Sequence, residues 1–253
     1  MKNALILLAG GTGRRLDSTK NTVPKQFIKI GNYNFIEYFL RNLDEKIFNK
    51  IHIVVNKSMQ KKYLSTLKKD FFKHQIKFVN AGRERQLSSK KGIYSLQKYC
   101  PEKVLIHDSA RPLASNKLIK RLLKSLDKYH SCSPFIINND LIKYKSKKNI
   151  FKYGKIINIQ TPQAFRFKSI LKAHRFSKNC CEKDDTSLLE KIGIKTKFIK
   201  GEKFNFKITY SDDLDLFKKL KKNEFRSGIG YDIHKINYNS KKKLILCGVK
   251  ISH

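Results

Sequence analysis

The chain has 253 residues, 40% of them hydrophobic, with 56 Lys and Arg against 20 Asp and Glu and a formal net charge of +36. This is enough for one large α/β domain, or for a domain with part of another, with a full hydrophobic core. No apolar run reaches transmembrane length and no cleavable leader precedes the first apolar run, so we expect a cytoplasmic protein that does not enter a membrane.

The chain's cysteines and lysines argue against a disulfide framework, a zinc ribbon and a dedicated nucleic-acid-binding surface. The five cysteines are odd in number and form no C-x-x-C pair, which argues against a disulfide framework and a zinc ribbon. The lysines are spread through every segment instead of forming one patch. This indicates a compositional bias more than a nucleic-acid-binding surface, although the positive charge attracts anionic substrates.

Short apolar runs alternate with longer amphipathic stretches along the first 222 residues. A buried parallel strand is a continuous apolar run, and ALILL at 4–8 predicts the first strand. Further strands are predicted at 51–55, 76–79, 104–107, 134–137 and 156–161. Helices are predicted at 35–43, 58–71, 88–99, 116–129 and 212–222. This alternation predicts an α/β fold, a mostly parallel sheet flanked by helices, with ligands beyond the carboxyl ends of the strands.

The pattern breaks at two places. Residues 138–155 form a polar, lysine-rich stretch that is read equally well as a loop or as a protruding β-arm. The helix at 212–222 closes a first domain predicted over 1–222. Because a fresh strand pattern follows it, residues 223–253 are predicted to begin a second, incomplete α/β domain.

The sequence LAGGTGRRL follows the first strand, at the place of the first strand-to-helix loop. Gly10, Gly11 and Gly13 allow the backbone to approach a ligand, and Arg14 and Arg15 add cations for phosphate. The loop has neither the GK[ST] ending of a P-loop nor the spacing of a dinucleotide fingerprint. We therefore predict another kind of nucleotide site, with a plain glycine turn and solvated arginines as the alternative.

Two short motifs carry candidate charges. In HDSARP, Asp108 follows a predicted strand at the carboxyl edge of the sheet, where it can bind a metal or a substrate hydroxyl. The alternative is an Asp that caps the next turn with Arg111 as its ion partner. In PKQF, Lys25 is a mobile charge suited to phosphate, although among so many lysines a surface role is the alternative.

Three more motifs complete the set. GRERQLSSKKGI places Gly82, Arg85 and Ser88 at a strand end and a helix start, where polar groups can contact a nucleobase or an anion. TPQAF begins at Thr161, and FKIT contains Lys207 before the last helix. Each motif is weak alone.

Together, LAGGTGRRL, PKQF, GRERQLSSKKGI, HDSARP, TPQAF, DDTSLLE and NFKIT resemble, in order and spacing, the 2-C-methyl-D-erythritol 4-phosphate cytidylyltransferase family. The resemblance covers residues 1–222. It implies a Rossmann-like nucleotidyltransferase fold and transfer of CMP from CTP to methylerythritol phosphate, with Mg²⁺ and release of pyrophosphate.

The resemblance also assigns residues to the site. It implies that Arg15, Lys25 and Lys207 surround the α-phosphorus of CTP, where negative charge builds during the attack. It implies that a larger group binds the two substrates: Ala9, Gly10, Gly11, Gly13, Gly82, Arg85, Ser88, Asp108, Arg111, Thr161 and Gln163.

The predicted arm departs from the family pattern. In the family, the arm of a partner subunit brings a threonine and an arginine to the acceptor, so the resemblance implies a homodimer. Here Leu141 follows Asp140, and Tyr153 stands at or near the arginine position. The acceptor affinity is therefore open, and another polyol phosphate such as ribitol 5-phosphate is the alternative acceptor. A basic nucleic-acid binder without turnover is the third interpretation.

The tail makes a second resemblance. SGIGYDIHKI and LILCGVKI resemble the start of 2-C-methyl-D-erythritol 2,4-cyclodiphosphate synthase, which some bacteria carry fused behind the cytidylyltransferase. Asp232 and His234 match the family's D-x-H pair, which binds a metal such as zinc. The family's third ligand lies beyond His253, so we expect at best a weak metal site and no synthase activity.

Overall fold

The computed structural model describes residues 2–11, 23–63, 76–138, 156–177, 182, 184–222, 244–246 and 249–251. The chain divides into two compact units, Met1–Lys219 and Leu220–His253. In the second unit, β9 (Leu244–Leu246) pairs antiparallel with β10 (Val249–Ile251). All of the predicted β-arm except Asn138 lies outside the described residues, as do Gly13, Arg15, Asp232 and His234.

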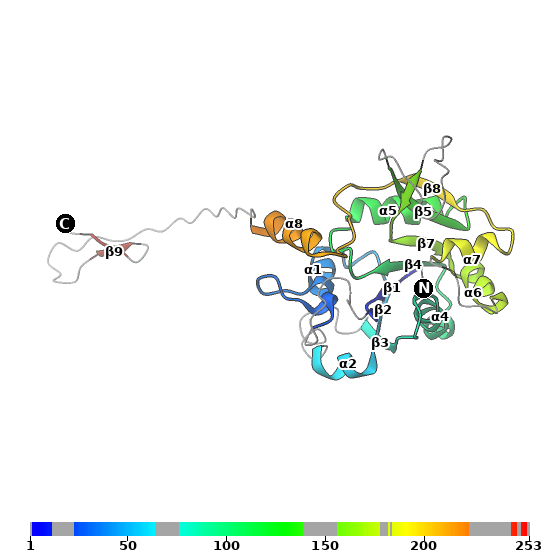
Figure 1. The fold of residues 1–253 in the computed structure, drawn as a ribbon, viewed down its shortest axis with the longest axis horizontal. Helices are drawn as coiled ribbons and strands as arrows, with labels where there is room; N and C mark the ends of the chain where they lie inside the picture. The colour runs from blue at the N-terminus through cyan, green and yellow to red at the C-terminus, as the bar shows by residue number, and fades with distance from the viewer. Residues whose placement is uncertain are drawn as a thin grey trace, which may run out of the picture. The chain divides into compact units, whose positions relative to one another are not determined.

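Strands rich in apolar residues form the parallel part of the sheet in the first unit (Figure 1). β1 (Asn3–Leu8) lies between β2 (Lys50–Val55) and β4 (Lys103–Asp108), and β3 (Ile76–Asn80) follows β2. All three pairings are parallel. The predicted strands of this half are confirmed, since each contains its predicted apolar run.

The other half of the sheet is mixed. Its strands are β5 (Ser131–Ile137), β6 (Ile157–Ile159), β7 (Gln163–Arg166) and β8 (Lys197–Lys200). The strand order is β3-β2-β1-β4-β7-β5-β6, with β8 parallel to β5, whereas β7 runs antiparallel to both β4 and β5. The sheet is therefore mostly parallel, as predicted. The sequence did not predict β7 or β8, and the strand expected at 156–161 has only three residues.

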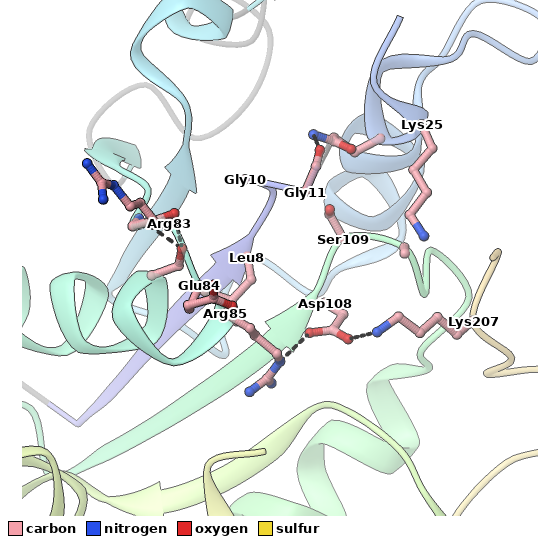
Figure 2. Close-up of a pocket in the computed structure, with 14 residues that line it drawn as sticks. Leu8, Gly10, Gly11, Lys25, Arg83, Glu84, Arg85, Asp108, Ser109 and Lys207 are labelled. Carbon is pink, nitrogen blue, oxygen red and sulfur yellow. Dashed lines mark hydrogen bonds and ion pairs between the residues drawn. The ribbon is translucent and has the colours of Figure 1, made fainter. Parts of the chain in front are cut away.

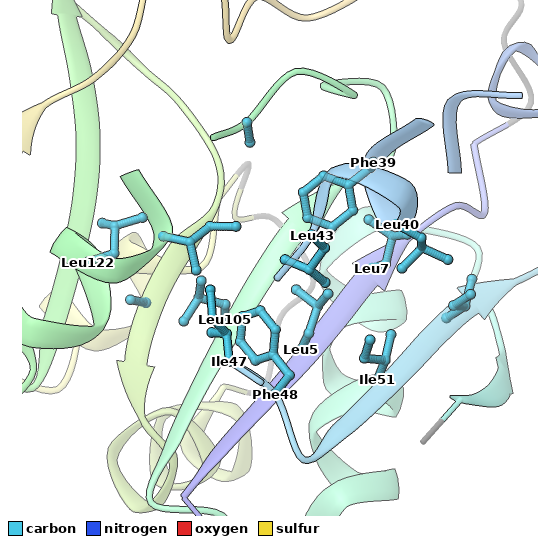
Figure 3. Close-up of a cluster of buried hydrophobic side chains, with 14 of the residues drawn as sticks. Leu5, Leu7, Phe39, Leu40, Leu43, Ile47, Phe48, Ile51, Leu105 and Leu122 are labelled. Carbon is cyan, nitrogen blue, oxygen red and sulfur yellow. The ribbon is translucent and has the colours of Figure 1, made fainter. Parts of the chain in front are cut away.

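Helices cover both faces of the sheet because successive strand residues point to opposite sides. Leu5 and Leu7 of β1 belong to one hydrophobic cluster with α1 (Phe35–Asn42) and α5 (Asn116–Ser125) (Figure 3). The alternate residues of β1 belong to the opposite cluster, with helices α4 (Arg85–Leu96), α6 (Phe167–Phe176) and α7 (Thr186–Glu190).

The remaining helices of the described residues are α2 (Lys57–Tyr63), α8 (Ser211–Lys222) and the short 3-10 turns η1 (Lys25–Phe27) and η2 (Gln97–Tyr99). The predicted helix at 58–71 can be compared with the structure only as far as Tyr63. Among the described residues, no helix has both the length and the apolar character needed to cross a membrane.

Local hydrogen bonds set the helix ends. Asn34 and Glu37 form a reciprocal capping box, in which the Asn34 side chain accepts from Glu37 N at 3.0 Å and Glu37 accepts from Asn34 N at 2.7 Å. α5 ends at Ser125, four residues before its predicted end. α4 begins at Arg85, three residues before its predicted start, and this places Arg85 in the first turn of the helix.

Candidate functional site

A cavity of about 380 Å³ opens beyond the carboxyl ends of β1 and β4 (Figure 2). In this parallel pair Leu8 lies opposite Asp108, so the glycine loop and the HDSARP segment leave the sheet side by side. Ligands of open α/β sheets bind in this kind of crevice. Among the residues predicted from the sequence, the cavity is lined by Gly10, Gly11, Lys25, Gly82, Arg85, Ser88, Asp108 and Lys207.

Two side-chain amides hold the carbonyl groups of the glycine loop. Gln26 Nε2 donates to Ala9 O at 2.6 Å and to Gly11 O at 2.9 Å, and Asn56 Nδ2 donates to Gly10 O at 3.1 Å. With the carbonyl oxygens held by amides, the loop is suited to present its N–H groups to an anion. Sequence reasoning missed Gln26 and Asn56, although Gln26 belongs to the PKQF motif.

We expect alanine to affect stability at one described glycine of the loop and ligand binding at the other. A Cβ at Gly10 would lie 2.6 Å from Ala81 Cβ, so Gly10→Ala should lower the free energy of unfolding by about 1–3 kcal/mol. At Gly11 no described atom lies within 4 Å of such a Cβ, so Gly11→Ala should leave unfolding unchanged. Because Gly11 lines the cavity, the added methyl group should weaken binding of CTP, the nucleotide that the resemblance implies, by about tenfold, or ~1.4 kcal/mol.

Urea unfolding and calorimetric titration with CTP measure the two effects, and each variant is the control for the other. Unaltered CTP affinity in Gly11→Ala would show that the nucleotide does not approach this part of the loop. An unaltered unfolding midpoint in Gly10→Ala would show that the loop yields at the contact with Ala81.

The main chain of Ile208 joins three motifs that are distant in sequence. Ile208 N donates to Ala110 O at 2.9 Å, and Ile208 O accepts from Lys25 Nζ at 2.8 Å. Ile208 itself is fully buried. PKQF, HDSARP and NFKIT therefore meet at one point, and the side chains of Lys25 and Lys207 reach the same cavity.

Asp108 lies between two cations (Figure 2). Its Oδ2 is 2.7 Å from Lys207 Nζ, and its Oδ1 is 3.3 Å from Arg85 Nε. Burial alone would raise the pKa of this carboxyl group, but the charges of Arg85 and Lys207 outweigh burial and hold the pKa well below its ordinary value. Asp108 is therefore ionised at neutral pH.

Arg111 does not pair with Asp108, in contrast to the turn-capping alternative. Its NH1 donates instead to Asn205 O at 2.7 Å, while its main-chain N donates to Asp108 O at 3.0 Å. Arg111 thus links HDSARP to the segment that contains Lys207. It does not line the cavity.

Asp185 belongs to the DDTSLLE motif, but sequence reasoning gave it no role in the site. It has only 1% of its surface exposed, and its Oδ2 is 2.7 Å from NH1 of Arg85. Burial alone would raise the pKa of Asp185, but the charge of Arg85 outweighs it, and the pKa falls to about 2. Arg85 is thus held between two carboxylates, one in the cavity and one behind it. Two adjacent acidic residues in so basic a chain were the available signal.

Gly82 and Ser88 line the cavity at the turn into α4. Ser88 Oγ accepts from Gly82 N at 3.0 Å, which closes the turn into α4. A Cβ at Gly82 would lie 2.4 Å from Leu87 Cβ, so only glycine fits this turn without a shift of the chain. Their predicted contact with the nucleoside stays a prediction.

The remaining predicted substrate-binding residues lie behind the cavity wall. Thr161 is 6% exposed, and its hydroxyl oxygen accepts from Asp108 N at 3.1 Å. Gln163 is fully buried, and its Nε2 donates to Asp184 Oδ2 at 3.0 Å. Neither they nor Ala9 line the cavity in the described structure. A direct substrate contact for Thr161, Gln163 or Ala9 stays a prediction.

Comparison with known proteins identifies related sequences. The family model for 2-C-methyl-D-erythritol 4-phosphate cytidylyltransferase matches residues 3–220. A protein named bifunctional enzyme IspD/IspF, from Wolbachia pipientis wMel, is 36% identical over 265 residues, with 100% of this chain and 65% of that protein covered. A 2-C-methyl-D-erythritol 4-phosphate cytidylyltransferase from Caldicellulosiruptor bescii is 35% identical over 218 residues, with 85% of this chain and 95% of that protein covered.

Solved structures are similar as well. The bifunctional IspDF from Campylobacter jejuni superposes with a TM-score of 0.70 at 30% identity, covering 100% of this chain and 63% of that one. A 4-diphosphocytidyl-2C-methyl-D-erythritol synthase from Anaerococcus prevotii gives a TM-score of 0.74 at 24% identity, covering 88% of this chain and 99% of that one, and supports the fold. The chain thus spans 65% of the bifunctional relative from Wolbachia.

Proposed function

Because the chain belongs to the 2-C-methyl-D-erythritol 4-phosphate cytidylyltransferase family, we propose that it transfers CMP from CTP to 2-C-methyl-D-erythritol 4-phosphate. The observation that carries the proposal is the cavity at the end of β1 and β4. A glycine loop, the lysines Lys25 and Lys207 and the carboxylate of Asp108 line it together.

The proposed reaction is a direct displacement. A phosphate oxygen of the acceptor attacks the α-phosphorus of CTP, a new P–O bond forms, the bond to the bridging oxygen of the β-phosphate breaks, and pyrophosphate leaves with that oxygen. Negative charge builds on the α-phosphoryl oxygens, and fixed cations stabilise it. Lys25 and Lys207 are the described cations for this task, and Arg15 is the third by resemblance. No covalent enzyme intermediate is needed.

The proposal gives the other cavity residues binding roles. The glycine loop binds the triphosphate through its N–H groups. Asp108, ionised at neutral pH, accepts hydrogen bonds from the acceptor's hydroxyl groups. Its pairing with Lys207 Nζ at 2.7 Å supports a short distance between acceptor and α-phosphorus in the complex.

The residues of the cavity do not fit a resident magnesium site. Both oxygens of Asp108 already face cations. The described part of the chain has no cluster of three or more His, Cys, Asp or Glu that could hold a metal ion. We infer that magnesium reaches the site bound to the triphosphate of CTP, with substrate oxygens as ligands.

We further infer a homodimer formed through the arm. Asn138 N donates to Ile156 O at 2.8 Å, so the described residues on either side of 139–155 lie next to each other. Ile137, Ile156 and Ile159 beside this junction are 38–50% exposed, which favours a covered surface. Sedimentation equilibrium tests this inference, and a monomer at micromolar concentration would contradict it.

We place the reaction in the cytoplasm, where CTP is made, and cell fractionation tests that location.

Pyrophosphate release from CTP and Mg²⁺ tests the proposed reaction. Methylerythritol phosphate and ribitol 5-phosphate are supplied in parallel, with an acceptor-free reaction as control. We expect release with methylerythritol phosphate. Release with ribitol 5-phosphate alone would change the acceptor, and salt-sensitive retention of nucleic acid without any release would favour a binding protein.

A further inference from the structure

His107 and Thr161 form a buried hydrogen-bonded chain behind Asp108. His107 is fully buried in the motif HDSARP, and its ring lies against Phe39 with the ring centroids 4.5 Å apart. Its Nε2 is 3.0 Å from Arg111 O, and its Nδ1 is 3.1 Å from Thr161 Oγ1. Thr161 Oγ1 is in turn 3.1 Å from Asp108 N.

The chemistry of these atoms fixes the direction of every hydrogen bond. A carbonyl oxygen only accepts, so His107 Nε2 must carry the proton that is shared with Arg111 O. In the neutral ring Nδ1 is then an acceptor, and the Thr161 hydroxyl donates to it. The same hydroxyl oxygen is left to accept from Asp108 N–H. Burial lowers the pKa of His107 to about 3, which keeps the ring neutral in the physiological range.

The hydrogen bonds continue from Thr161 to the segment that carries Lys207. Asn205 is fully buried, and its Nδ2 donates to Thr161 O at 2.8 Å, while its main-chain O accepts from Arg111 NH1 at 2.7 Å. Thr161 therefore contacts both sides of the Asp108–Lys207 pair. It bonds to the main chain of Asp108 directly and to the Lys207 segment through Asn205.

We propose that His107 and Thr161 are positioning residues that hold the Asp108 carboxylate in place for the acceptor substrate. This inference rests on the proposed function for the acceptor's identity. The proposal assigns a positioning role to His107 of HDSARP and to Thr161, and neither role requires contact with a substrate. Loss of the threonine hydroxyl leaves Asp108 N–H without its acceptor and His107 Nδ1 without its donor.

Three variants test the proposal. Thr161→Val removes the hydroxyl at similar volume, and Thr161→Ser keeps it. Thr196→Val is the matched control. The Oγ1 atom of Thr196 lies 3.0 Å from Ser131 Oγ, and neither residue lines the cavity. We expect Thr161→Val to raise KM for methylerythritol phosphate about tenfold or more and to change KM for CTP by less than about threefold. We expect both KM values in Thr161→Ser and Thr196→Val to stay within about threefold of the unmodified protein.

Two measurements stand apart from turnover. Nitrogen-15 NMR of the unmodified protein should show His107 with Nε2 protonated and Nδ1 bare. Crystal structures should show Asp108 displaced in Thr161→Val and retained beside Lys207 in Thr161→Ser. A different His107 tautomer, an undisplaced Asp108 or equal changes in both KM values would overturn the proposal. If the unmodified protein releases no pyrophosphate, the proposed function fails, while the tautomer and the position of Asp108 still decide this inference.

Discussion

Replacing Lys207 by alanine is expected to slow pyrophosphate release from CTP by about 100-fold or more. Removal of one group that stabilises transition-state charge costs about 10²–10³ in rate. Lys207 meets the geometric requirement, since its side chain lines the cavity and its Nζ lies 2.7 Å from Asp108, where the acceptor is proposed to bind. The measurement is the initial rate at saturating CTP and methylerythritol phosphate.

Lys203→Ala is the matched control for that variant. Lys203 is an exposed lysine four residues earlier in the same segment, so its loss removes the same chain-wide charge without touching the cavity. We expect its rate to stay within about twofold, because distant surface charges are screened by salt. A Lys207→Ala rate within a few-fold of the unmodified enzyme would show that Lys207 is not a catalytic residue.

The second large effect is on stability. Asp185→Asn removes the charge that faces Arg85 inside the protein, where Asp185 is 1% and the Arg85 side chain 26% exposed. Its loss leaves Arg85, among the described residues, with Asp108 alone, a carboxylate that Lys207 also faces, and we expect the free energy of unfolding at pH 7 to fall by about 3 kcal/mol. Urea unfolding measures this change. Asp215→Asn is the control, because the pair of Asp215 with Lys218 on α8 is exposed.

The stability difference should also depend on pH. The pKa of Asp185 falls from 3.8 to about 2 on folding. A group with a depressed pKa contributes its full stability above the unfolded value and loses it as the pH falls towards the folded value. The difference between the unmodified protein and Asp185→Asn should therefore shrink by about 1 kcal/mol between pH 7 and pH 3. A difference that stays constant over this range would contradict the ionised pair.

Parts of the fold with a simple burial pattern were predictable from the sequence. β1, β2 and β4 have five consecutive buried residues each, and these are apolar except for His52 in β2 and for His107 and Asp108 in β4. β7 has only four residues, QAFR, which are too few to separate from a loop by periodicity. β5 begins at Ser131, three residues before its predicted start. The added residues Ser131, Cys132 and Ser133 are buried although the two serines are polar, so an apolar pattern did not reveal them.

The site divides in a similar way. Asp108 was predicted to line a site from its place at a strand end, whereas Lys25 and Lys207 were predicted from the resemblance that their motifs carry. Residues that act from behind the wall carry no such mark. The partner of Asp185 is Arg85, 100 residues away in the sequence, so only the fold reveals the pair. Gln26 lines the cavity, but its hydrogen bonds to the glycine loop likewise become visible only in the fold.

The junction at Ile208 also bears on how such sites change during evolution. Its N–H and C=O groups make the contacts to Ala110 and Lys25, while its side chain packs with Phe35 and Phe217. Main-chain contacts do not depend on side-chain identity, so any residue that fills this small core can keep the two segments together, except proline, which lacks the N–H. Mutational drift can therefore replace residue 208 without moving either lysine of the site.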